Sequence, residues 1–258
     1  MKIGVVGLGL IGGSTFKKLK ALNYDVVGIS NSQNGKDQNI TNNINALTDC
    51  EIVFVATPMN KTIEKLHEIE KVVKPDTIVT DCCSLKEFLE NETFNFKFIP
   101  SHPMAGTEFQ GYENSFEDLF IGAKWVITPI NDTSTKTLEN IIKQLGAMPI
   151  ITTPKEHDKA VALISHMPMV LAQALMENIK NNNLAQKLAS SGFRDMTRLA
   201  LSNTEMAKDM VNLNHKNIQE SILKLYSVLG DLIKDYPNKI EEIKSSREKM
   251  YKDGKNVL

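Results

Sequence analysis

Residues 3–13 read IGVVGLGLIGG, a short apolar run followed at once by the pattern G-x-G-x-x-G. In a strand–turn–helix unit, Gly7 permits the tight turn, Gly9 lets the backbone approach a pyrophosphate, and Gly12 lets the helix pack close to the strand. The phosphates then lie at the helix N terminus, where free N–H groups favour anions. The pattern predicts a dinucleotide-binding loop formed by Gly7, Leu8, Gly9, Leu10, Ile11 and Gly12. The alternative is a glycine turn with a purely structural role.

The end of the second expected strand bears on which dinucleotide binds. An Asp or Glu there accepts hydrogen bonds from the ribose of NAD, but residues 28–32 read GISNS and contain no carboxylate. Ser30, Asn31 and Ser32 can all donate hydrogen bonds to a 2′-phosphate. The sequence therefore predicts NADP in preference to NAD, with Lys36 in place of the usual arginine. The alternative is a neutral slot that accepts either cofactor.

The first half of the chain alternates short apolar runs with amphipathic stretches. This alternation predicts a doubly wound, mostly parallel sheet with helices on both faces, a Rossmann-like α/β fold. Residues 31–45 are polar and Asn-rich, and we expect them to form a loop. Thr57 and Pro58 follow the third strand, where a helix would start, and we assign them to the cofactor site. The expected strands are 3–6, 26–29, 51–56, 77–80, 97–100, 125–128 and 148–152. The first expected helix follows the glycine-rich turn and ends near Leu22, and the next two span 61–73 and 135–145.

After Pro154 the pattern becomes helical, and no convincing strand follows. We therefore divide the chain into a dinucleotide-binding domain, 1–152, and an all-helical substrate and dimerisation domain, 153–258. Long apolar faces without a partner sheet indicate burial against a second subunit, which predicts a homodimer. The expected helices are 157–178, kinked at Pro168, and 184–189, 194–201, 204–234 and 240–251.

Composition excludes several classes of protein. Lys and Arg number 30 against 31 for Asp and Glu, so the chain lacks the basic surplus of a nucleic-acid-binding protein. No apolar run approaches the roughly 20 residues that cross a bilayer. Five glycines between Gly4 and Gly13 interrupt the N-terminal apolar stretch, which argues against a secretory signal. The three cysteines form no zinc-binding spacing, so we expect no metal and a reducing, cytoplasmic setting.

Two of the five histidines stand out. His102 lies in the segment PSHPMAGT, residues 100–107, directly after the fifth expected strand. Ligands bind beyond the carboxyl ends of strands in an open parallel sheet, so His102 is expected beside the nicotinamide. His166 lies inside an apolar helix, where a hydrogen-bonded core histidine is the better interpretation from the residue alone.

Several segments, in this order, resemble the prephenate/arogenate dehydrogenase (TyrA) family, and most of all the cyanobacterial-type arogenate dehydrogenases. They are GLGLIGGS at 7–14, DCCSLK at 81–86, HPMAGTE at 102–108, the run from His157-Asp158 to Ser165-His166-Met167-Pro168, and SSGFRDMTR at 190–198. The resemblance implies an oxidoreductase of tyrosine biosynthesis that decarboxylates a cyclohexadienol oxidatively. Hydride passes from the ring to the nicotinamide, CO2 leaves, and the ring becomes aromatic.

The resemblance also implies roles for individual residues. His102 matches the catalytic histidine, and a neutral imidazole can accept the ring hydroxyl proton near pH 7. Ser84 matches the serine that orients that hydroxyl. Arg198 matches the arginine that holds the ring carboxylate through two parallel charged hydrogen bonds; the alternative is a salt bridge on a helix surface. The remaining substrate-site assignments are Thr107, Gly106, His166 and Arg194. Arg194 and Asp195 are expected to reach the site from the neighbouring subunit or to pair with that subunit.

Two departures from the family pattern bear on the substrate. Prephenate dehydrogenases usually carry SHxPH, whose last position is Met169 here, and often a tryptophan where this chain has Ala207. Arogenate carries an ammonium where prephenate carries a keto group, and an imidazolium would repel it. The sequence therefore favours arogenate. The alternatives are a prephenate or dual-specificity cyclohexadienyl dehydrogenase, a β-hydroxyacid or imine reductase, and a non-catalytic dinucleotide sensor.

Overall fold

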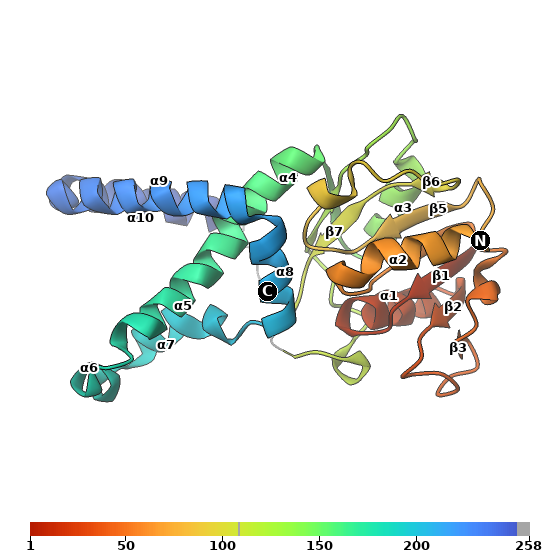
Figure 1. Ribbon diagram of the computed structural model, residues 1–258, viewed down its shortest axis with the longest axis horizontal. Coiled ribbons are helices and arrows are strands. Elements are labelled where there is room, and N and C mark those ends of the chain that lie inside the picture. The colour runs from red at the N-terminus through yellow and green to blue at the C-terminus, as the bar shows by residue number, and fades with distance from the viewer. Residues whose placement is uncertain (108, 252–258) are drawn as a thin grey trace. The chain divides into compact units, whose positions relative to one another are not determined.

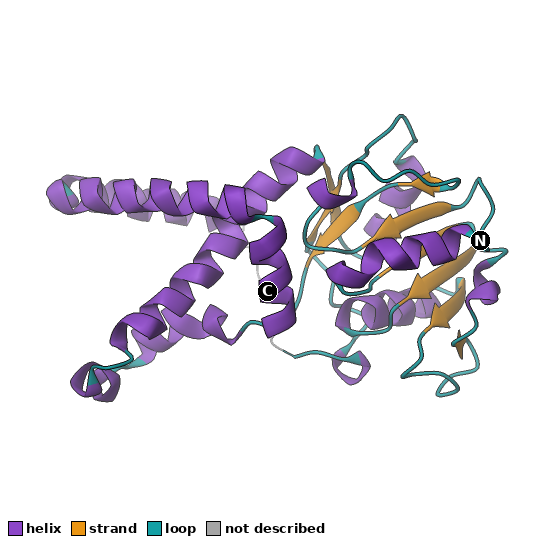
Figure 2. Cartoon of the chain, in the orientation of Figure 1, coloured by secondary structure: helices purple, strands orange, loops and turns teal. Residues whose placement is uncertain are grey.

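The computed structural model describes residues 1–107 and 109–251; Glu108, part of the HPMAGTE segment, lies outside the described residues. The chain divides into two compact units, Met1–His157 and a second that begins at Asp158. Every strand lies in the first unit, and the described part of the second unit is helical (Figure 2). The predicted fold class, an α/β unit followed by an all-helical unit, is confirmed.

The first unit is built on a six-stranded parallel sheet (Figure 1). Its strand order is β3-β2-β1-β4-β5-β6, the doubly wound order in which ligands bind at the switch point between the two halves. That switch point lies between β1 and β4, at their carboxyl ends. The strands are β1 Lys2–Val6, β2 Asp25–Ile29, β3 Ile40–Thr41, β4 Ile52–Val55, β5 Ile78–Asp81 and β6 Lys97–Phe98, and the crossover helices are α1 Leu10–Ala21 and α2 Met59–Glu70.

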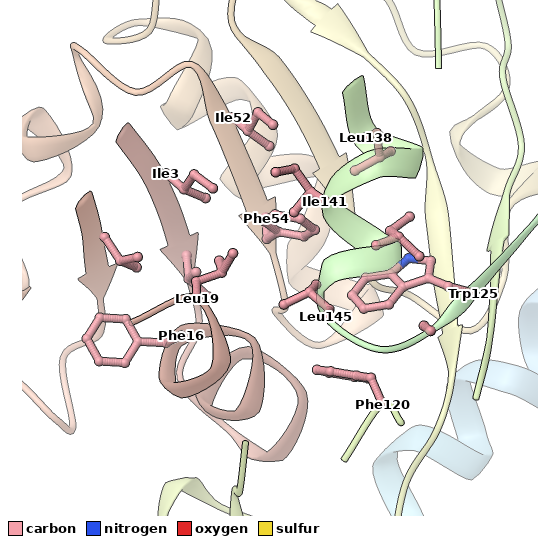
Figure 3. Packing of buried hydrophobic residues seen from close by; sticks show 14 of the residues in the cluster. Ile3, Phe16, Leu19, Ile52, Phe54, Phe120, Trp125, Leu138, Ile141 and Leu145 are labelled. Carbon is pink, nitrogen blue, oxygen red and sulfur yellow. The ribbon is translucent and has the colours of Figure 1, made fainter. Parts of the chain in front are cut away.

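Alternation along the strands fills both faces of this sheet. On one face, Ile52 and Phe54 of β4 pack with Phe16 and Leu19 of α1 and with Trp125 (Figure 3). On the other face, the intervening residues of β1, β4 and β5 pack against α2; they are Val6, Val53, Val55 and Val79, with Leu66 and Ile69 from the helix. Since both faces are covered, the strands read as continuous apolar runs rather than as alternating ones.

A second, three-stranded sheet follows in the same unit, in the order β7-β8-β9. Its strands are β7 Ser101–Met104, β8 Lys124–Ile127 and β9 Met148–Ile151, and α3 Lys136–Gln144 packs between the sheets. β7 runs antiparallel to β8, and β9 runs parallel to it. The strand expected over 97–100 is shorter, β6 Lys97–Phe98, because the chain leaves the first sheet after Phe98 and enters the second at Ser101. The expectation of a single sheet was wrong.

The segment 31–45, expected to be a loop, contains the short edge strand β3 and a 3-10 turn, Ile44–Leu47. Ser30 N donates to Thr41 O, and Gly28 N donates to Asn39 O. Backbone hydrogen bonds therefore join the end of β2 to β3 and to the residue before it. No helix intervenes between β2 and β3. The end of β2 beside the glycine loop is therefore bordered by turns.

The helical unit departs from prediction at two points where a long helix was expected. The first long helix is divided into α4 Pro154–Val161, a π-helical turn Ala162–His166 and α5 Met167–Ile179. Pro168 lacks the N–H that would bond the carbonyl of Ile164, and the widened turn lies at that carbonyl. The expected helix 204–234 breaks at Asn214 into α8 Thr204–Leu213 and α9 His215–Lys234. The remaining helices are α6 Asn183–Leu188, α7 Ser191–Thr197, a 3-10 turn Arg198–Leu201, and α10 Tyr236–Tyr251, which lies beside α9.

Within the described residues, one helical run, Pro154–Ile179, is long and apolar enough to cross a membrane by length and composition alone. The run contains three buried polar side chains, His157, Asp158 and His166, and core helices of other proteins meet the same test. The helical unit also exposes large apolar side chains, among them Leu201, Tyr226 and Ile233.

Candidate active site

The glycine loop follows β1, and its glycines divide into two kinds. Gly7 has φ +85°, and a Cβ there would lie 2.5 Å from the carbonyl oxygen of Ala56, just after β4. A Cβ at Gly12 would lie 1.9 Å from the carbonyl oxygen of Gly7. Gly9 has open space around it, with no heavy atom within 4 Å of a Cβ. Packing therefore requires Gly7 and Gly12, whereas Gly9 leaves room for a ligand.

The N terminus of α1 has the properties of an anion site. Gly9 caps the helix without a side-chain hydrogen bond, and the first turn contains no acidic residue. The first backbone N–H groups of the helix have no partner within it. Leu8 is buried, while Leu10 and Ile11 are only partly covered. These residues fit the pyrophosphate of a dinucleotide.

The end of β2 presents hydroxyl and amide groups. Ser30 Oγ lies 3.4 Å from Ser32 Oγ and accepts a hydrogen bond from Gln33 N at 3.3 Å. Asn31 and Ser32 are exposed, and the buried Oε1 of Gln33 has no hydrogen-bond partner in the described part of the chain. Lys36 Nζ lies 3.8 Å from the Glu113 carboxylate, so its ammonium is already directed to an acidic partner. The expected substitution of Lys36 for the arginine is therefore weakened.

Ser84 lies in the loop after β5, and its Oγ contacts Met59 Sδ at 3.5 Å. Thr57 follows β4, the neighbouring strand, and its Oγ1 lies 3.0 Å from Thr62 Oγ1. Thr62 in turn contacts Cys83 Sγ at 3.1 Å. Because β1, β4 and β5 are adjacent and parallel, the glycine loop, Thr57 with Pro58, and Ser84 share one edge of the sheet.

Cys83 beside Ser84 is a buried structural thiol. Burial raises the pKa of the Cys83 thiol to about 12, and burial also raises the pKa of Cys82. A thiol, rather than a thiolate, is therefore present near neutral pH.

A buried ion pair connects the β5 loop to the second sheet. Lys86 Nζ donates to the Asp81 carboxylate and, at 2.7 Å, to the carbonyl oxygen of Ser101. The Asp81 carboxylate also accepts from Ser101 N at 3.2 Å and from Cys83 N at 2.8 Å. Both charged side chains are fully buried. One carboxylate and one ammonium therefore hold the backbone on either side of Ser84 and immediately before His102.

His102 lies within β7, not after a strand of the first sheet as expected. It pairs with Val126 of β8. The preceding residue, Ser101, turns toward the core, where its Oγ accepts a hydrogen bond from Trp125 Nε1 at 2.9 Å. Alternation along the strand directs His102 to the opposite face, and its Nδ1 lies 3.0 Å from Nε2 of His157 in α4.

Gly106 and Thr107 follow β7 and are both exposed. Thr107 Oγ1 exchanges hydrogen bonds of 3.2 Å with the backbone N–H and carbonyl of Phe109. No heavy atom lies within 4 Å of a Cβ built at Gly106. Both residues are accessible to a ligand.

His166 belongs to the helical unit and is buried. Asn214, at the break between α8 and α9, donates through Nδ2 to His166 Nδ1 at 3.2 Å and to the carbonyl oxygen of Asp158 at 2.8 Å. This arrangement fits a hydrogen-bonded core histidine. Its role as a substrate ligand stays a prediction.

Arg194 and Arg198 also belong to the helical unit, and both are exposed. Arg194 Nε lies 3.4 Å from the Asp195 carboxylate. In the described part of the chain, Arg198 lies within ion-pair distance of no acidic side chain. The structure therefore lends no support to the alternative of a surface salt bridge, and the guanidinium is available for an anionic ligand.

The structure thus brings the predicted cofactor residues, Ser84 and His102 into one unit and places Arg194, Arg198 and His166 in the other. His157 was not among the predicted site residues. Its sequence signal was weak, since a histidine next to an aspartate at a helix start fits a local pairing as well.

Two family models match this sequence. Residues 29–150 match "Prephenate dehydrogenase, nucleotide-binding domain", and residues 153–245 match "Prephenate dehydrogenase, dimerization domain". Among curated proteins, the prephenate dehydrogenase of Lactococcus lactis subsp. cremoris is 30% identical over 96% of this chain and 77% of that protein.

Solved structures give the same result. The crystal structure of Synechocystis arogenate dehydrogenase has a TM-score of 0.81 and 30% identity, and the match covers 100% of both chains. The prephenate dehydrogenase of A. aeolicus, in complex with hydroxyphenyl propionate and NAD+, has a TM-score of 0.83 and 25% identity over 98% of both chains.

Proposed function

Because this chain belongs to the prephenate dehydrogenase family, we propose that it catalyses the oxidative decarboxylation of L-arogenate to L-tyrosine with NADP as the hydride acceptor. The observation that carries this proposal is the shared sheet edge formed by the glycine loop, Thr57 and Ser84, with His102 anchored next to it through Ser101, Asp81 and Lys86. A dinucleotide site and a candidate base are thus held on the same rigid framework.

In the proposed reaction, two side chains of this protein, His102 and Ser84, act on the hydroxyl group of the substrate ring. When bound, the dinucleotide would supply the acceptor for the hydride that leaves the ring carbon bearing the hydroxyl. His102 accepts the hydroxyl proton at Nε2, and Ser84 orients the hydroxyl. The bond between the ring and its carboxylate then breaks, CO2 leaves, and the electron pair makes the ring aromatic. The phenolate oxygen takes up a proton to complete the product.

Arg198 supplies substrate recognition in this proposal. An exposed, planar guanidinium can form two parallel charged hydrogen bonds with the ring carboxylate. The other proposed substrate residues are Gly106 and Thr107 of the first unit and His166 and Arg194 of the helical unit. The preference for arogenate rests on Met169, which is buried in the helical unit and brings no positive charge where a histidine would.

The preference for NADP rests on the end of β2. Ser30, Asn31 and Ser32 offer hydrogen-bond donors and no carboxylate that would repel a 2′-phosphate. Titration of the protein with NADP in the presence of competing NAD tests this point. Tighter binding of NADP supports the proposal, and tighter binding of NAD overturns it.

A second candidate is oxidation of prephenate, with NAD as acceptor. It is favoured by the names of the Lactococcus relative and of the A. aeolicus structure, the latter with NAD+ bound. The Lactococcus relative and the Synechocystis enzyme are each 30% identical to this chain.

We also propose that the chain forms a homodimer through its helical unit and is cytoplasmic. The exposed apolar side chains of α9, among them Tyr226 and Ile233, and the family description of this region support the dimer.

The deciding experiment is a spectrophotometric assay of dinucleotide reduction with each substrate and each cofactor in the four combinations. We expect the highest kcat/KM for arogenate with NADP. A higher value for prephenate assigns the second candidate function, and absence of turnover in all four combinations overturns the dehydrogenase proposal.

A further inference from the structure

His102 and His157 form a direct contact between two regular elements of the first unit. Nδ1 of His102 lies 3.0 Å from Nε2 of His157, and the rings are nearly perpendicular, at 83°. His157 is 3% exposed, so solvent has little access to compete for this contact. The distance and burial together indicate a hydrogen bond between the two imidazoles.

Only one tautomer of this pair leaves His102 able to accept a proton at Nε2. If His102 carries its proton on Nδ1, that N–H donates to His157 and Nε2 keeps a lone pair. If His157 Nε2–H donates instead, neutral His102 carries its proton on Nε2 and cannot act as a base there. The orientation of this hydrogen bond therefore decides whether His102 can act as a base at Nε2.

We propose that His157 is a positioning residue that accepts a hydrogen bond from Nδ1–H of His102 and keeps Nε2 of His102 unprotonated in the resting protein. This inference rests on the proposed function of His102 as the base. When Nε2 receives the hydroxyl proton, His102 becomes an imidazolium whose Nδ1–H donates a charge-assisted hydrogen bond to His157. His157 thus stabilises the positive charge without adding a negative one.

The backbone around both residues keeps this geometry rigid. His157 lies in α4, and its N–H donates to the carbonyl oxygen of Thr153 at 3.0 Å. His102 is held in β7 by its pairing with β8 and by the contacts of Lys86 and Asp81 with Ser101. Sites built on helices and strands hold their side chains more precisely than sites on loops.

The first test compares two variants of His157 by steady-state kinetics. His157→Gln keeps an acceptor, the amide oxygen, near the position of Nε2, whereas His157→Leu removes it. We expect His157→Leu to lower kcat about tenfold or more, part of the roughly 10²–10⁴-fold that general base catalysis supplies. KM and the cofactor Kd should stay unchanged, and His157→Gln should restore most of kcat.

The matched control is His67, an exposed histidine in the same unit that contacts Glu70 at 3.4 Å. His67→Gln and His67→Leu should leave kcat unchanged. Equal losses of kcat in His157→Gln and His157→Leu would overturn the proposal, because the acceptor would then have no effect. Wild-type kcat in His157→Leu would overturn it as well.

A second test is independent of activity. Long-range 1H–15N correlation spectra of protein labelled on histidine report which ring nitrogen carries the proton, and the His102 signals are assigned by their loss in His102→Asn. We expect neutral His102 to be protonated on Nδ1, and protonation on Nε2 would overturn the proposal. If the wild-type protein turns over no cyclohexadienyl substrate, the proposed function fails, while this spectrum still decides the orientation of the hydrogen bond.

Discussion

Lys86 donates a hydrogen bond to the Asp81 carboxylate at a point where both side chains are fully buried. The same ammonium donates to the carbonyl oxygen of Ser101. This pair joins the end of β5, which leads to Ser84, to the start of β7, which carries His102. Taking two charges out of water is costly, and the contacts to backbone groups offset that cost.

Removing the ammonium should leave Asp81 buried without a counter-ion. We expect Lys86→Met to lower the free energy of unfolding by about 3–5 kcal/mol, measured by urea denaturation. The matched control is Lys74→Met, because Lys74 pairs with Asp49 at 2.7 Å on the surface. That exposed pair should contribute little to the free energy of unfolding, because water screens it. Similar losses in the two variants would contradict a special role for the buried pair.

Substitution by alanine should have different effects at Gly12 and at Gly9 of the glycine loop. Gly12→Ala places a Cβ 1.9 Å from the carbonyl oxygen of Gly7, so we expect a lower melting temperature. Gly9→Ala meets open space, so its melting temperature should match the wild type, while the affinity for dinucleotide falls because the Cβ enters the phosphate region. Calorimetry provides both measurements. Unchanged dinucleotide affinity in Gly9→Ala would argue against a phosphate site there.

Cys83 should make stability depend on pH in the alkaline range. Burial raises the pKa of its thiol from 9.0 to about 12. Above pH 9 the unfolded chain releases this proton and the folded protein keeps it, so stability is lost as the pH rises from about 9 to about 12. Between pH 8 and pH 10, the stability advantage of the wild type over Cys83→Ala should decrease by about 1 kcal/mol. A constant difference in urea denaturation would contradict the raised pKa.

Arg198 should act on substrate binding rather than on folding. Arg198→Gln removes a charged pair of hydrogen bonds worth about 1.5–3 kcal/mol, so KM should rise roughly 10- to 160-fold. The melting temperature should stay unchanged, because the side chain is exposed. Arg247→Gln is the control, since Arg247 stacks on Tyr251 in α10. An unchanged KM in Arg198→Gln would make this arginine structural.

Much of the first unit could be predicted because its signals are local. The glycine loop follows an apolar strand directly, and the apolar runs 51–56 and 77–80 fall on β4 and β5. The strand that carries His102 was missed because Pro103 interrupts it, and proline argues against a strand. In the structure β7 is an edge strand, which tolerates that proline.

The features that were missed depend on contacts between residues far apart in sequence. Asn214 breaks a helix whose apolar pattern continues across it, because its side chain bonds His166 and the backbone of Asp158. His157 meets His102 across 55 positions of sequence. Neither contact leaves a periodic pattern in a single sequence, so neither could be predicted from it.

The most direct test of the central claim is the turnover of His102→Asn with its preferred substrate and cofactor. Asparagine removes the proton acceptor with little change in volume, so kcat should fall by about 100-fold or more. The cofactor Kd should equal that of the wild type, because His102 is outside the glycine loop. Turnover close to the wild-type rate would contradict the assignment of His102 as the base.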